Sequence, residues 1–116
     1  ANLGQCCGVA SAGTFLLQLS QASEAYLPIR ASTRATAARA AQRLAAAIAS
    51  RSVPAGDGGL ARALPSPEEH SAPTDTRWQA GWMQGASGMA SFLLHARSVA
   101  AGEVAGMREP WPDEPW

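Results

Sequence analysis

The chain has 116 residues, 47% of them hydrophobic, and its nine basic residues balance nine acidic ones for a formal net charge of zero. This length suits one small domain or part of a larger one, and because alanine supplies much of the apolar fraction, a deep private core is not expected. The neutral balance gives no electrostatic reason to expect a nucleic acid or an anionic membrane as partner.

Two further features limit where the protein works. No continuous apolar run approaches the roughly twenty residues of a membrane span, and no signal peptide is expected. The two cysteines are adjacent, so they cannot link distant segments as a disulfide framework would. We therefore expect a cytoplasmic protein whose thiols serve thiol or metal chemistry.

The first expected helix runs from about residue 11 to residue 26, and Pro28 stops its pattern. Apolar side chains recur at helical spacing along it. They are Phe15, Leu16, Leu19, Ala22 and Tyr26.

The second expected helix covers residues 33–51, which contain neither glycine nor proline. Ser32 or Thr33 is placed to accept hydrogen bonds from its first amides. Arg39 and Arg43 lie on a different face from its apolar line, and we see no cluster among the nine arginines that supply all the basic charge. The predicted apolar line is Ala37, Ala41, Leu44 and Ile48.

Residues 53–77 are rich in proline and glycine, so a long loop or insertion without regular structure is expected there. The third helix is predicted over residues 86–99 and the tail over 102–116 as extended or turn-like chain. No segment alternates long enough to predict a sheet, and the fold class is therefore all-α. The apolar positions of the third helix are Met89, Phe92, Leu93, Ala96 and Val99.

One unit occurs twice in the chain. Cys7-Gly8-Val9-Ala10-Ser11 followed by Thr14-Phe15-Leu16-Leu17 returns as Gln84-Gly85-Ala86-Ser87-Gly88 followed by Ser91-Phe92-Leu93-Leu94, at an offset of 85 − 8 = 77 residues. A glycine turn leading into a helix allows close backbone approach and directs free amides into the same space. Only the first copy has Cys6 and Cys7 before the glycine, where the helix dipole favours the thiolate that binds zinc or acts as a nucleophile.

These strings resemble motifs of the lanthionine synthetase C-like (LanC-like) cyclases. Gln5-Cys6-Cys7-Gly8-Val9-Ala10 is similar to the family's Cys-His-Gly motif, Gly81-Trp82-Met83-Gln84-Gly85-Ala86-Ser87-Gly88 to its last inward glycine turn, and Trp111-Pro112-Asp113-Glu114-Pro115-Trp116 to a Pro-Asp tail of one branch. The resemblance spans nearly the whole chain, in the same order, and is weakest over residues 53–77.

The resemblance implies an α/α toroid of inner and outer helices around a catalytic zinc. In the family, zinc activates a peptide cysteine that adds to a dehydrated serine or threonine and closes a thioether ring, as in lantibiotic biosynthesis. Carried over by position, Cys6 is a zinc ligand, and Cys7 stands where the family has a histidine ligand. Met83 follows Gly81-Trp82 where a third ligand would need a thiolate, so it is not assigned.

The family's upstream helices, further zinc ligand and acid/base residues have no counterpart in residues 1–116. The chain therefore resembles the C-terminal portion of a cyclase, an incomplete, truncated toroid inactive alone. Its uncovered inner faces would need self-association or a partner chain to complete the ring.

Other interpretations of the candidate residues stay open. Cys6 and Cys7 could be buried small side chains or a strained adjacent disulfide. His95 is expected to be an ordinary helix-face residue and His70 a solvated one. The four tryptophans, Trp78, Trp82, Trp111 and Trp116, could cap the bundle or stack on a sugar or peptide.

Three functions are therefore carried forward: a LanC-like zinc enzyme or its zinc-bearing part, a non-catalytic helical module that completes a partner toroid, and a toroid-type carbohydrate-active protein. The last has little support from carboxylates, because Glu68-Glu69 and Asp113-Glu114 are adjacent pairs and are not placed across a cleft.

Overall fold

The computed structural model describes residues 3, 8–22, 25, 27–54, 62–63 and 86–103. Three helices and one short strand pair make up the regular structure in these ranges. The helices are α1 (Val9–Gln21), α2 (Ala31–Ser50) and α3 (Ala86–Ala100). The predicted all-α class is confirmed for the part of the chain that is described.

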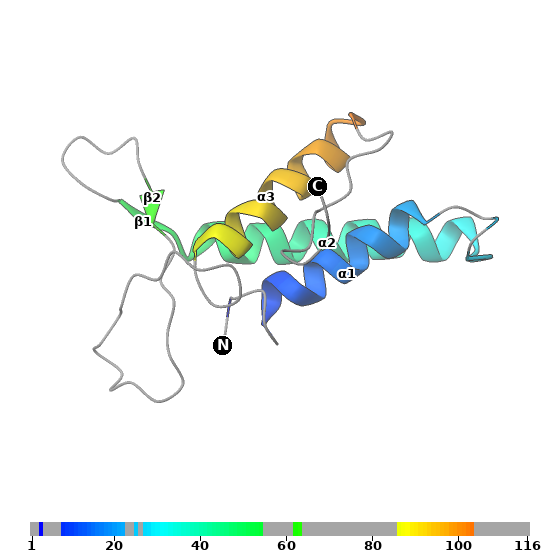
Figure 1. The fold of residues 1–116 in the computed structure, drawn as a ribbon, viewed down its shortest axis with the longest axis horizontal. Coiled ribbons are helices and arrows are strands. Elements are labelled where there is room, and N and C mark those ends of the chain that lie inside the picture. The colour runs from blue at the N-terminus through cyan, green and yellow to red at the C-terminus, as the bar shows by residue number, and fades with distance from the viewer. Residues whose placement is uncertain are drawn as a thin grey trace, which may run out of the picture.

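Helices α1 and α3 run in the same general direction, and α2 runs the opposite way alongside them (Figure 1). The centre of the core is made of large, fully buried side chains from all three helices: Leu17 of α1, Ile48 of α2, and Met89 and Phe92 of α3. On α2, alanines fill the remaining inward positions, so the helices can approach closely.

The ends of α1 and α2 differ from the predictions. Helix α1 ends at Gln21, well before Pro28, because Ala22 adopts an extended conformation with ψ 134°. Helix α2 begins at Ala31, and its cap residue Arg30 makes no side-chain cap bond, so the proposed cap at Ser32 or Thr33 is wrong.

Helix α3 ends because a glycine follows its last turn. Gly102 has a positive φ of 71°, a conformation that glycine adopts without a side-chain clash. Its amide donates to the carbonyl of Val99 at 3.1 Å, and the amide of Glu103 donates to the carbonyl of Ser98 at 3.0 Å. This pair of bonds is the Schellman motif that satisfies the last carbonyls of a helix.

The segment after α2 contains regular structure that was not predicted. Strand β1 (Val53–Pro54) pairs antiparallel with β2 (Arg62–Ala63), in the register Val53 with Ala63 and Pro54 with Arg62. Proline is tolerated here because a two-stranded ribbon has only edge strands. The prediction of fully irregular chain over 53–77 is therefore wrong at these positions, and the rest of that segment lies outside the described residues.

Candidate functional site

The start of α1 is the point from which the predicted metal site would be built. Gly8 is the cap residue, in an extended conformation with φ −118° and ψ −170°, and its carbonyl accepts the first helical bond from Ala12 at 3.2 Å. The amide of Ala10 donates to the carbonyl of Leu3 at 3.2 Å, and the Leu3 side chain is buried. The bond from Ala10 and the burial of the Leu3 side chain therefore hold residue 3 against the first turn of α1.

Cys6 and Cys7 themselves lie outside the described residues, so the zinc site stays a prediction. Among the residues that the structure does describe, no group of three or more histidine, cysteine or acidic side chains is placed to hold a metal ion. Two thiolates fit zinc by donor type, but they are two of the four ligands that a tetrahedral site needs. A complete zinc site would need further ligands besides these two.

Several other candidate residues also lie outside the described ranges. They are His70, Met83, Gln84, the four tryptophans, and the acidic pairs at 68–69 and 113–114.

The two copies of the repeat fold alike in one respect. Helix α1 begins at Val9 and α3 at Ala86, which is the same offset of 86 − 9 = 77 residues, and each starts directly after the repeated glycine. A helix therefore follows the repeated glycine in both copies, as predicted. Helix α2 lies between these two helices in the sequence.

In another respect the two copies differ: they bury opposite faces. Leu17 of α1 is fully buried, whereas its counterpart Leu94 in α3 is 59% exposed. Conversely, Phe92 of α3 is fully buried, whereas its counterpart Phe15 in α1 is 62% exposed. Of the apolar residues noted at helical spacing in the first helix, Phe15 is exposed, and Leu16 and Leu19 are half-buried.

The close fit between α1 and α3 explains why α1 buries its Leu17 side and not its Phe15 side. A Cβ atom placed on Gly13 would lie 2.1 Å from Cζ of Phe92, so the aromatic ring fills the space that the missing side chain leaves. The residues of α1 that are buried beside it are small or slender: Ala10, Thr14 and Leu17. Phe15 on this side would leave no room for Phe92.

His95 is not an ordinary helix-face residue, contrary to the prediction. It is 5% exposed, and its Nε2 lies 3.0 Å from Oε1 of Gln21, the last residue of α1. Because the amide oxygen of Gln21 can only accept, Nε2 is the donor in this bond. Since α1 has 13 residues and is about 20 Å long, His95 lies at the opposite end of α1 from Gly8.

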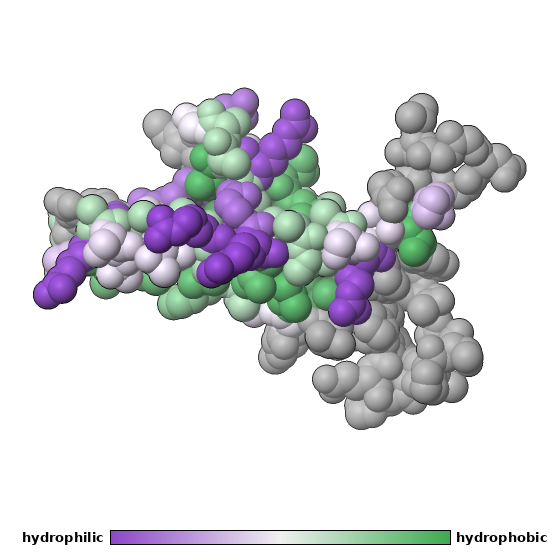
Figure 2. All heavy atoms as spheres, turned by 180° about the vertical axis from the view of Figure 1, so that it is seen from behind, coloured by the Kyte–Doolittle hydropathy of each residue, from purple (hydrophilic) through white to green (hydrophobic). Residues whose placement is uncertain are grey.

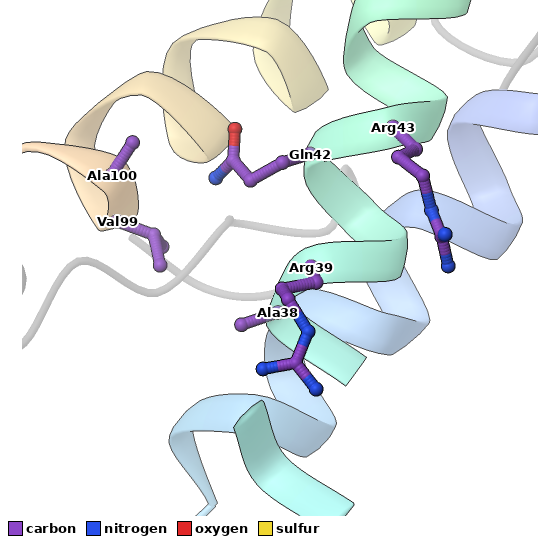
Figure 3. A pocket seen from close by; sticks show the side chains of 6 residues that line it. All are labelled: Ala38, Arg39, Gln42, Arg43, Val99 and Ala100. Atoms are coloured by element: carbon purple, nitrogen blue, oxygen red, sulfur yellow. The ribbon is translucent and has the colours of Figure 1, made fainter. Parts of the chain in front are cut away.

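An open hollow of 390 Å³ lies between α2 and α3 and was not foreseen. It is lined by Ala38, Arg39, Gln42, Arg43, Val99 and Ala100. Figure 3 shows that the amide of Gln42 points toward α3, whereas the Arg43 side chain points away from it. The Gln42 amide nitrogen donates to the carbonyl of Ala96 at 2.8 Å and so joins the two helices.

Arginines gather along α2, although no cluster was predicted. Five of the nine arginines lie within residues 30–51, where no acidic residue occurs. When the molecule is seen from behind, hydrophilic side chains are spread along its length (Figure 2). The local absence of acidic residues was the signal in the sequence. Arg39 donates to Thr36 at 3.2 Å, and Arg34 donates to the carbonyls of Leu27 and Ile29, which fixes the chain before α2.

Comparison with known proteins gives no family for this chain: no family model, no curated protein and no solved structure matches it. Among the described helices, none combines the length and the apolar character that crossing a membrane requires.

Proposed function

We propose that this chain is the zinc-bearing C-terminal part of a LanC-like cyclase of the cytoplasm, acting on peptide thiols once the rest of an α/α toroid is supplied. The observation that carries the proposal is the start of α1 directly after Gly8, which follows Cys6-Cys7 in the sequence. Helices α1 and α3 would be inner helices of the toroid, and α2 an outer one.

The residues of this chain have defined tasks in this proposal. The positive end of the α1 dipole follows the cysteines directly in the sequence, which favours their thiolate forms. Cys6 and Cys7 would hold zinc together with ligands from outside the described residues. Zinc, when bound, lowers the proton affinity of a peptide thiol so that the thiol can add to a dehydrated residue.

Metal analysis of the full chain tests the proposal without any need for turnover. Because Cys6 and Cys7 are the only cysteines, thiol reactivity reports on this pair alone. After expression with ample zinc, we expect bound zinc that slows thiol modification, and cobalt substitution should give thiolate-to-metal absorption bands. Absence of metal and fully reactive thiols would contradict the proposal.

Matched variants separate ligation from a structural role. Cys6→Ser and Cys7→Ala should each lose the metal, because each removes a thiolate. Cys7→His restores the family's own ligand type and should keep zinc while changing the cobalt spectrum. If Cys7→His and Cys7→Ala behave alike, residue 7 is not a ligand.

A second candidate function, the helical interaction module, is supported by a different observation. Phe15 and Leu94 are 62% and 59% exposed, and α1 contains no charged residue at all. An uncharged helix with a large aromatic side chain facing outward is typical of a surface that another element covers.

A further inference from the structure

The exposed faces of α1 and α3 correspond, position by position, to faces that are already packed together inside the molecule. The Phe15 face of α1 comprises Ala12, Phe15 and Leu19, and the Leu94 face of α3 comprises Ser87, Ala90 and Leu94. At the 77-residue offset, the Phe15 face is the counterpart of Met89, Phe92 and Ala96, which are buried in the core. The Leu94 face is the counterpart of Ala10, Gly13 and Leu17, which are buried as well.

The internal packing shows that these two kinds of face fit each other. Phe92 of α3 lies over Gly13 of α1, so a face of the Phe92 type meets a face of the Leu17 type. The molecule thus contains one such contact between α1 and α3, and in addition α1 exposes the Phe15 face and α3 exposes the Leu94 face. Stacked helical repeats are built in this way: the face exposed at one end of a unit is complementary to the face exposed at the other end.

We propose that a second copy of this chain docks head to tail, with the Phe15 face of one copy against the Leu94 face of the next. The contact is heterologous: the two copies use different surfaces, so association continues beyond two copies unless a ring closes. The proposal does not depend on the cysteines or on zinc.

The chemistry of the two faces suits burial. Helix α1 has no charged side chain, and Arg97, three residues and nearly one turn beyond Leu94, is the charged residue at the edge of the other face. Covering Phe15 and Leu94 removes two large apolar side chains from water, while no ion on the Phe15 face has to be desolvated.

One substitution in the repeat limits how tightly the copies bind. The counterpart of Gly13 is Ala90, and a Cβ at Gly13 would lie 2.1 Å from the ring of Phe92. Phe15 of a docked copy therefore cannot approach Ala90 as closely as Phe92 approaches Gly13. The intermolecular contact is a looser version of the internal one.

Sedimentation of the full chain over a range of concentrations tests the proposal. Wild-type protein should associate, and Phe15→Glu or Leu94→Glu should each weaken association by about 100-fold, because an unpaired carboxylate would be buried. An equimolar mixture of the two variants should form a 1:1 complex, since Phe15→Glu keeps an intact Leu94 face and Leu94→Glu keeps an intact Phe15 face. A wild-type protein that is monomeric throughout, or a mixture that stays monomeric, would overturn the proposal.

Two controls make the test specific. Ala46→Glu adds the same charge at an exposed position of α2 and should leave association unchanged; equal weakening there would overturn the assignment of the faces. If a glutamate variant does not fold, Phe15→Ser and Leu94→Ser serve in the same mixing experiment.

Ala90→Gly tests the register of the contact. It recreates the space found at Gly13 and should tighten association by about tenfold, whereas Ala100→Gly, off the Leu94 face of the same helix, should not. Unchanged or weaker association of Ala90→Gly would overturn the correspondence between the internal and the intermolecular contact.

Discussion

Helices α1 and α3 carry the same sequence unit and begin at the same position in it, yet they turn opposite sides toward the core. The unit determines where each helix starts, because the glycine precedes the first turn in both copies. It does not determine which side is buried. The buried side is decided by the neighbouring helices. Because α1 and α3 pack against each other, the side of the repeat that is buried in one helix is exposed in the other.

The comparison implies that equivalent residues have unequal energetic weight. A repeated apolar residue stabilises the fold only in the copy in which it is packed. Paired substitutions at equivalent positions therefore test the arrangement directly, since each pair changes the same chemistry in two environments.

The largest difference is expected for the phenylalanine pair. Phe92→Ala should lower the free energy of unfolding by about 3–5 kcal/mol, because it empties the space over Gly13 in the core. Phe15→Ala should change it by about 0.5 kcal/mol or less at protein concentrations where the chain is monomeric, because Phe15 is 62% exposed. Urea denaturation followed by circular dichroism measures both; equal losses would contradict the opposite burial of the two faces.

For the leucine pair, the substitution in α1 should cost more stability than the one in α3, the reverse of the phenylalanine pair. Leu17→Ala is expected to cost about 2–4 kcal/mol, since Leu17 is fully buried, and Leu94→Ala about 0.5 kcal/mol or less. Together with the phenylalanine pair this forms a crossed pattern: the sensitive phenylalanine is in α3 and the sensitive leucine in α1. A general difference in stability between the two helices would instead make both substitutions in one helix costly.

A smaller effect is expected at the glycine that receives Phe92. Gly13→Ala gains about 1 kcal/mol of helix propensity but forces a Cβ to 2.1 Å from a buried ring, so a net loss of about 1–2 kcal/mol is expected. The added substitution Phe92→Leu should recover part of this loss by making room. An Ala residue tolerated at position 13 would show that α1 and α3 are not this close.

The sequence was sufficient to place the three helices and the fold class. Regular apolar spacing and the absence of glycine and proline mark helical segments whatever surrounds them. Of the five apolar positions noted in α3, Met89, Phe92 and Ala96 are fully buried, and Leu93 and Val99 are half-buried. Helix α1 was harder, because it has no charged residue and carries apolar side chains on more than one side, and spacing alone cannot choose between two such sides.

The features that were missed depend on contacts between distant residues. Burial of His95 requires Gln21, which is 74 positions away, and no local pattern points to that pairing. The pairing of Val53 with Ala63 likewise depends on a strand of only two residues. The metal site was predicted from Cys6 and Cys7 and remains a prediction, because these residues lie outside the described part of the chain.

The smallest expected effect concerns the polar bond that joins the end of α1 to α3. Gln21→Ala removes the partner of Nε2 of His95, and because Gln21 is itself exposed, water can replace part of the lost bond. A loss of about 1 kcal/mol in the free energy of unfolding is expected. Gln18→Ala, in the same helix on the exposed side, is the matched control and should cost less than about 0.5 kcal/mol. If the two substitutions lower the free energy of unfolding equally, the 3.0 Å bond contributes nothing to holding α1 against α3. The close fit of Phe92 over Gly13 would then hold these two helices together without it.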